Sequence, residues 1–80
     1  MSPREKEIPT APIDRILHQE GAKRVSEEAA KALRDFVEEV ARSISREASE
    51  LAKHAGRRTV TKEDVEFAIR RFYKRLESPL

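Results

Sequence analysis

The 80-residue sequence contains no cysteine and no tryptophan, and it has only two glycines. Without cysteine, disulfide bonds and thiolate metal sites are excluded. A chain this short buries only a modest fraction of its surface, so small domains usually need a disulfide, a metal or another chain for stability. We therefore expect a partner chain to complete the hydrophobic core.

Long apolar runs are absent as well. None approaches the roughly 20 residues that span a bilayer. The amino-terminal stretch MSPREKE lacks the apolar segment of a secretory signal. These absences predict a cytoplasmic protein without a membrane partner.

The chain has little net charge although charged residues make up 40% of it. Seventeen lysines and arginines face fifteen acidic residues, which leaves a net charge of +2. This balance is unlike that of a polycationic tail. If the protein binds nucleic acid, its positive charge must be concentrated at particular sites. One short cluster is Arg57 and Arg58, which lie in a link between two predicted helices, within HAGRRTV.

The residue groups that carry catalysis are missing. The sequence has no glycine-rich phosphate loop and no HExxH pair. His18 and His54 are the only histidines, and they lack the spacing of metal ligands. We therefore predict that the protein is not an enzyme and has no metal, no cofactor and no small-molecule substrate.

Two prolines and a glycine delimit a first short helix. Pro9 and Pro12 suit the start of a helix, and Gly21 suits a left-handed cap at its end. The apolar residues between them fall on one helical face. Residues 1–8 precede this helix as a polar segment, which we expect to be a flexible arm.

A long central helix is predicted from Ser26, a good N-cap, to Gly56. Its apolar positions keep spacings of three and four over about seven turns, and its length corresponds to roughly 42 Å. Thr61 and Asp64 form a short-armed capping box that opens a last helix. We assign residues 9–75 to one domain and 76–80 to a carboxy-terminal tail.

The flanking helices are too short to cover the whole apolar stripe of the central helix. A second copy that crosses the first would bury the remainder. This pattern predicts an obligate dimer, whose stability depends on protomer concentration.

Three segments resemble the archaeal histones: IPTAPIDRIL, GAKRVSEEA and LAKHAGRRTVTKEDVEFAI. With the helix between them, they cover residues 8 to about 74. The resemblance implies an all-α histone fold in an intertwined head-to-tail homodimer. It further implies non-sequence-specific binding, bending and compaction of double-stranded DNA, by dimers that form tetramers or larger assemblies on the chromosome or nucleoid.

The resemblance also implies roles for individual residues. It pairs the first link of one chain with the second link of the other, and it joins Arg57 to Asp64 as a structural ion pair. Gly21 lies where stacked dimers approach each other. The implied dimer–dimer interface consists of Leu51, His54 and Asp64. The implied DNA-binding residues are Arg15, Lys23, Arg24, Arg57, Arg58 and Thr59.

Some features depart from the family pattern. Glu20 is bulky and negative beside Gly21, and the tail after Phe72 is longer than in minimal relatives. The tail and the low net charge leave an alternative open. The protein would then be a histone-fold subunit that pairs with a different chain and scaffolds a protein complex, with little DNA binding.

Overall fold

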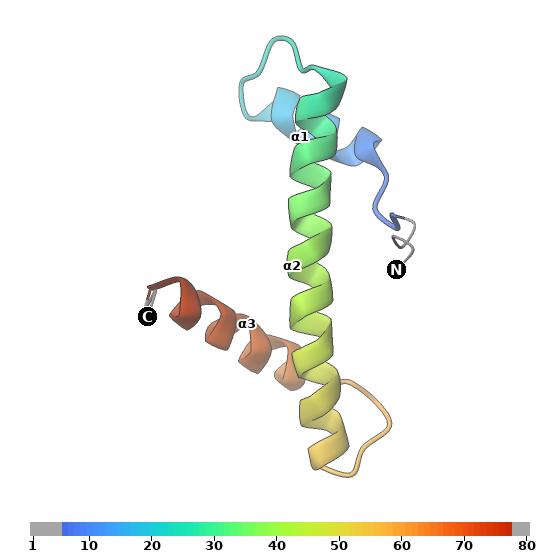
Figure 1. Ribbon diagram of the computed structural model, residues 1–80, viewed down its shortest axis with the longest axis vertical. Coiled ribbons are helices and arrows are strands. Elements are labelled where there is room, and N and C mark those ends of the chain that lie inside the picture. Colours follow the sequence, from blue (N-terminus) through green and yellow to red (C-terminus); the bar gives the residue numbers. More distant parts are fainter. Residues whose placement is uncertain (1–5, 78–80) are drawn as a thin grey trace, which may run out of the picture. The chain divides into compact units, whose positions relative to one another are not determined.

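The computed structural model describes residues 6–77, which form three α-helices and no strand. Helix α1 spans Thr10–Gln19, α2 spans Glu27–His54 and α3 spans Lys62–Glu77 (Figure 1). The predicted order of short helix, link, long helix, link and short helix is confirmed. The chain divides into two compact units, residues 1–40 and 41–80, and α2 contributes turns to both.

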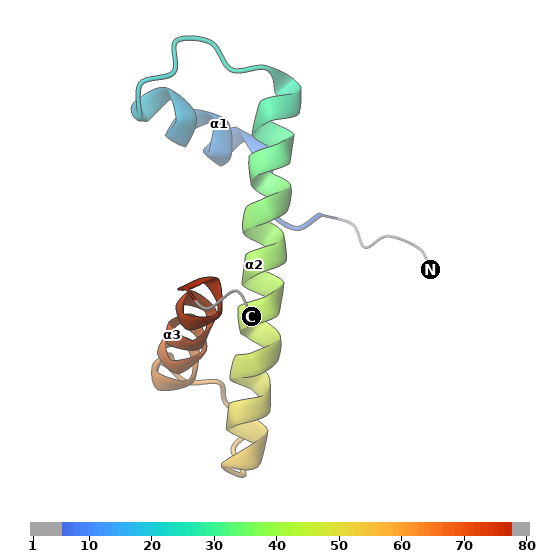
Figure 2. The same cartoon turned by 60° about the vertical axis from the view of Figure 1, so that its left-hand side comes forward.

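In the first unit, α1 lies beside the amino-terminal turns of α2 (Figures 1 and 2). Ile13 of α1 and Ala30 of α2 are buried. The predicted cap of α2 is present, because the Ala29 N–H donates to the Ser26 hydroxyl oxygen at 3.0 Å. At the end of α1, Gly21 has a φ of 114°, a backbone conformation that glycine adopts without strain.

In the second unit, α3 lies beside the carboxy-terminal turns of α2 (Figure 2). Arg71 and Arg75 of α3 form ion pairs with Glu47 of α2 at 2.8 and 3.1 Å. The buried apolar residues are alanines: Ala48 and Ala52 on α2 and Ala68 on α3. These small side chains allow the helices to approach closely, but they bury little apolar area.

Described residues extend beyond the predicted domain of residues 9–75 at both ends. Helix α3 continues to Glu77, two residues beyond the predicted domain end at residue 75, and residues 78–80 of the predicted tail lie outside the described residues. At the other end, residues 1–5 of the predicted arm also lie outside them. Glu7 and Ile8, which were assigned to that arm, donate backbone hydrogen bonds to Glu38.

Several large apolar side chains are exposed on the single chain, and no large side chain of the described residues is fully buried. Phe36 of α2 is 61% exposed, and Ile16 of α1 is 49% exposed. Exposed apolar side chains of this kind leave surface that a partner chain could cover. None of the helices between residues 6 and 77 is both long enough and apolar enough to cross a membrane.

Candidate nucleic-acid interface

The link between α2 and α3 begins with a tight turn. The Gly56 N–H donates to the Lys53 carbonyl at 2.9 Å, and the Arg57 N–H donates to the Ala52 carbonyl at 2.9 Å. This pair of bonds is a Schellman motif, which requires a left-handed residue after the helix. Gly56 provides it with a φ of 72°. The direction in which Arg57 and the following residues leave α2 is therefore defined.

Arg57 is directed back onto the start of α3. Its Nη1 donates to Asp64 Oδ2 at 2.7 Å and its Nη2 donates to Asp64 Oδ1 at 2.9 Å. Nη1 also donates to the Thr59 carbonyl at 3.1 Å. This two-point pair is the one that the resemblance implies. It connects both ends of the link and uses most of the donor capacity of Arg57.

Asp64 accepts further bonds from the cap of α3. The Thr61 N–H donates to Asp64 Oδ2 at 2.9 Å, and the Asp64 N–H donates to the Thr61 hydroxyl oxygen at 3.3 Å. The side chain of Asp64 is 7% exposed. Hydrogen bonds from Arg57, and then from the Thr61 backbone, lower the pKa of the Asp64 carboxyl far below its usual range, and burial opposes them only in part. Asp64 is therefore ionised whenever the fold is intact near neutral pH.

The next residues of the same link face solvent. Arg58, Thr59 and Val60 are all exposed, and no ion pair of Arg58 occurs within residues 6–77. The guanidinium of Arg58 and the hydroxyl of Thr59 can both donate hydrogen bonds to phosphate oxygens. The two adjacent arginines of the link therefore differ: Arg57 stabilises the turn, whereas Arg58 faces solvent.

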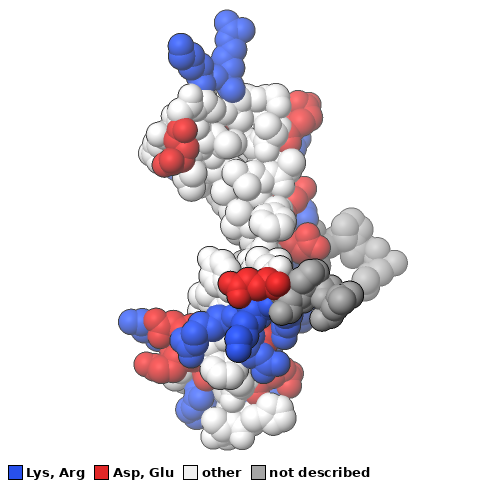
Figure 3. Space-filling view, turned by 90° about the vertical axis from the view of Figure 1, so that its left-hand side faces the viewer, with Lys and Arg blue, Asp and Glu red and all other residues white. Residues whose placement is uncertain are grey.

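The link between α1 and α2 carries the other basic pair. The Gly21 N–H and the Ala22 N–H donate to the carbonyls of His18 and Leu17, both at 3.1 Å, which forms a second Schellman motif. His18 Nδ1 donates to the Ala22 carbonyl at 2.9 Å. Lys23 and Arg24 follow and are exposed. Figure 3 shows basic side chains that project from this link.

Arg15 lies on α1, where it is exposed. The structure therefore leaves Arg15, Lys23 and Arg24 of the first unit open to solvent, together with Arg58 and Thr59 of the second. Along the chain, the two sets are separated by the 28 residues of α2.

The sequence matches known histones over most of its length. A family model described as histone-like transcription factor (CBF/NF-Y) and archaeal histone matches residues 6–69. One of the subunits of the archaeal histone HAN1 from Thermococcus zilligii is 53% identical over 64 residues, which are 80% of this chain and 96% of that protein. The probable archaeal histone 3 of Methanocaldococcus jannaschii is 52% identical over 64 residues, with the same coverage of both chains.

The chain belongs to the archaeal histone family. Its three helices, with the long α2 in the centre, form the histone fold. Histones are DNA-binding packaging proteins of chromosomes, and they are not enzymes. As a member of the family, the protein has the same class of function. Within residues 6–77 no cluster of three or more histidine, cysteine or acidic side chains could hold a metal ion.

The residues expected to join histone dimers lie in the second unit. Leu51 and His54 are three positions apart on α2 and therefore share one face. Leu51 is half-buried, whereas the side chain of His54 is 82% exposed, with Nε2 at 4.0 Å from Glu50 Oε2. Asp64 is shielded by its bonds to Arg57 and Thr61.

Gly21, the expected stacking position of this histone, is exposed. A Cβ atom added to it would meet nothing within 4 Å. The left-handed φ is therefore what requires glycine in the single chain. The space above it remains open to a neighbouring molecule.

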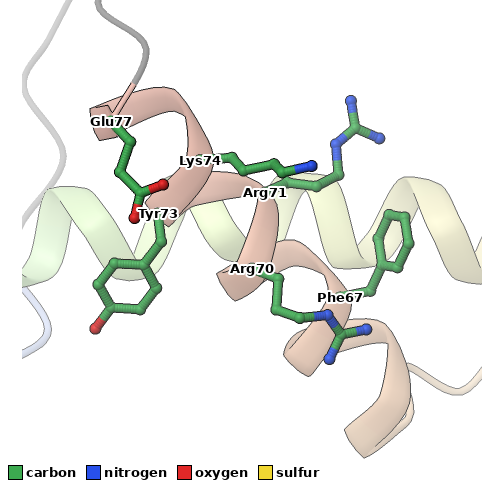
Figure 4. A pocket seen from close by; sticks show the side chains of 6 residues that line it. All are labelled: Phe67, Arg70, Arg71, Tyr73, Lys74 and Glu77. Atoms are coloured by element: carbon green, nitrogen blue, oxygen red, sulfur yellow. The ribbon is translucent and has the colours of Figure 1, made fainter.

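A hollow on α3 was not expected from the sequence. This hollow, of about 430 Å³, is lined by Phe67, Arg70, Arg71, Tyr73, Lys74 and Glu77 (Figure 4). The guanidinium carbons of Arg70 and Arg71 lie 5.7 and 5.8 Å from the centroid of the Phe67 ring. The sequence signal that could have indicated this hollow was Phe67, a large apolar residue outside the apolar face of α3.

The role of Glu38 was also missed. It is a charged residue that is only 4% exposed, on the helix that carries most of the apolar stripe. Its spacing of eight residues from buried Ala30 places it on the same side of α2. The spacing can be read from the sequence, but the hydrogen bonds of Glu38 with the Glu7 and Ile8 N–H groups cannot.

Proposed function

We propose that this histone binds double-stranded DNA as an intertwined head-to-tail homodimer. In that dimer the first link of one chain lies beside the second link of its partner. Lys23 and Arg24 then complete one phosphate-binding site with Arg58 and Thr59 of the other chain. The observation that carries the proposal is the outward Arg58 and Thr59 in a link held rigid by Arg57 and Asp64.

The apolar surface of the single chain supports the dimer. Phe36 and Val37 are exposed along α2, and burial of apolar area stabilises association at about 25 cal/mol per Å². A second α2 that crosses this stripe would remove it from water. Two such chains would place a basic site at each end of the dimer.

The exposed groups favour binding of the DNA backbone over reading of the bases. Guanidinium groups and hydroxyls donate to phosphate oxygens, which are the same in every sequence. An arginine at the position of Arg24 can enter the minor groove, where bendability is read more than base identity. Non-sequence-specific binding, bending and compaction follow, with dimers that join into tetramers or larger assemblies.

The ion pair assigns Arg57 mainly to the structure of the link. It was predicted both as a DNA-binding residue and as the partner of Asp64. Nη1 and Nη2 are both occupied by Asp64, although the side chain remains 39% exposed. We therefore propose that Arg57 contributes its charge to the site while Arg58 supplies the direct bonds.

Titration of a labelled random-sequence duplex at several salt concentrations tests the DNA proposal. A protein that neutralises phosphates loses affinity steeply as salt rises. Replacement of Arg24, Arg57 and Arg58 by alanine should flatten that dependence. Lys31→Ala removes a cation outside both links and serves as the control. Absence of binding by the purified homodimer at low salt would refute the proposal.

A second candidate is a histone-fold subunit that pairs with a different chain. The relative from Thermococcus zilligii is named as one subunit of a histone, which favours this candidate. It predicts that the purified chain by itself remains unfolded or monomeric and binds duplex weakly. Sedimentation equilibrium of the isolated chain distinguishes the two, since the first candidate requires a stable homodimer.

A further inference from the structure

The backbone just before α1 is held by two charged side chains of α2. The Glu7 N–H and the Ile8 N–H both donate to Glu38 Oε1 at 2.8 Å. Arg34 Nη1 donates to the Ile8 carbonyl at 3.0 Å. Both polar groups of the Ile8 backbone are thus bound to α2 by side chains one helical turn apart. These contacts constitute the Glu38–Arg34 clasp.

The clasp is a buried and specific arrangement. Glu38 is 4% exposed, and the side chain of Arg34 is 14% exposed. Arg34 is itself oriented by a 2.7 Å bond from Nε to Asp35 Oδ1. Hydrogen bonds to an ionised partner are about twice as strong as neutral ones. Such bonds offset the cost of burying the Glu38 carboxylate on α2.

The clasp compensates for the weak start of α1. Pro9 is the N-cap of this helix, and it makes no side-chain cap bond. The direction of the first turn is therefore set outside α1, by bonds between residues 30 and 31 positions apart. At its other end, α1 is held by the Schellman motif and by His18 Nδ1. Attached at both ends, α1 presents Arg15 in a defined direction.

We propose that Glu38 and Arg34 are positioning residues for DNA binding. They hold the start of α1 on α2 so that its first turn and Arg15 meet the phosphate backbone together. Neither side chain touches the duplex. This inference rests on the proposed function and adds two residues, from the middle of α2, that the binding site requires.

Two substitutions at one position isolate the clasp. Glu38→Ala and Glu38→Gln remove the same negative charge, so their general electrostatic effects on DNA affinity are equal. The glutamine keeps an acceptor oxygen for the Glu7 and Ile8 N–H groups, whereas alanine has none. We expect the alanine variant to bind a random-sequence duplex about tenfold more weakly than the glutamine variant, given typical energies at helix termini.

A double-mutant cycle distinguishes positioning from general loss of stability. Arg15→Ala should lower the salt dependence of binding by about one contact in the wild type and in Glu38→Gln. In Glu38→Ala it should have almost no further effect, because Arg15 is already displaced. Arg58→Ala should act equally in all three backgrounds. Equal effects of Arg15→Ala in all three would overturn the inference.

A less drastic pair serves if Glu38→Ala fails to fold. Arg34→Ala and Lys31→Ala each remove one positive charge from α2, and only the first removes a bond to Ile8. The inference requires Arg34→Ala to bind duplex DNA more weakly than Lys31→Ala. It also requires Arg15→Ala to have almost no further effect on DNA binding in the Arg34→Ala background. If neither Arg15→Ala nor Arg58→Ala alters DNA binding in the wild-type background, the proposed function fails. If both weaken binding there, but Glu38→Ala binds DNA like Glu38→Gln and Arg34→Ala binds it like Lys31→Ala, only the clasp is refuted.

Discussion

Arg57 and Asp64 form a two-point ion pair across the turn between α2 and α3, with Nη1–Oδ2 at 2.7 Å and Nη2–Oδ1 at 2.9 Å. The pair joins the residue that follows the Schellman turn to the third residue of α3. The link between them is therefore short and rigid, although its middle residues face solvent. A rigid link presents donors to a phosphate without a large loss of conformational entropy on binding.

This ion pair makes the free energy of unfolding depend on pH in the acidic range. The pKa of Asp64 is lowered in the folded protein, so its stabilising contribution is complete above the ordinary carboxyl pKa of about 4. It declines as the pH falls below that value towards the folded pKa. The free energy of unfolding, measured in urea from about pH 5 to pH 2, should fall more steeply for the wild type than for Asp64→Asn. Parallel curves would contradict this account.

Arg57→Ala and Arg58→Ala should differ in their effects on thermal stability and DNA binding, although both remove the same charge. Arg57→Ala leaves Asp64 without its main partner and should lower the melting temperature. Arg58→Ala alters an exposed side chain, so its stability should stay within about 0.5 kcal/mol of the wild type. It should reduce the salt dependence of DNA binding by about one contact per site. Thermal melts and salt titrations of both variants check this, and a reversed order would refute the division of roles.

The cap of α3 provides a test of local stability. The hydroxyl of Thr61 accepts the Asp64 N–H, and loss of such a cap costs about 1 kcal/mol. Thr61→Ala should therefore destabilise the protein by about that amount, whereas Thr61→Ser keeps the hydroxyl and should remain close to the wild type. Urea unfolding of the three proteins measures the difference. Equal losses in both variants would show that the methyl group, and not the cap, is responsible.

The proposed dimer has a thermodynamic signature. If apolar side chains such as Phe36 are buried between two chains, the melting temperature should rise with protein concentration. Phe36→Asp should abolish the dimer, because it would bury an unpaired charge. Phe36→Leu keeps an apolar side chain and is the matched control. Calorimetry over a hundredfold range of concentration with sedimentation analysis tests this, and a stable, concentration-independent monomer would contradict it.

The expected dimer–dimer interface can be tested on DNA. Replacement of Leu51 by glutamate, or of His54 by alanine, should leave the dimer intact, because the two side chains are proposed to meet a second dimer. The length of DNA protected from nuclease should then become shorter. Regular steps in the protected length of the wild type would indicate stacking, and one short footprint would indicate a closed unit. Unchanged protection in both variants would show that this assignment is wrong.

The helices could be predicted well because their signals are local. Ser26 and Thr61 cap the helices that they were expected to cap. Gly21 and Gly56 adopt the left-handed conformation expected after a helix. Each of these signals depends on residues within about six positions of each other. The predicted length of α2 was correct for the same reason.

The candidate site was predictable only in part. The basic links could be found as charge clusters, and the resemblance to histones indicated which residues face DNA. The charge pattern alone could not show that Arg57 is turned towards Asp64 while Arg58 faces solvent, since both are arginines in one short link. The Glu38–Arg34 clasp was not predicted at all, because a glutamate within a charged helix usually lies in solvent.

The sequence by itself determined the three helices, their caps and the positions of the two basic links, because hydrophobic periodicity and capping act between neighbours in the chain. Only the tertiary structure decided which charges are used inside the molecule and which remain available to a ligand. Glu38 meets the backbone of Glu7 and Ile8 across about thirty residues. Such contacts depend on how helices pack, and no local preference of the chain encodes them.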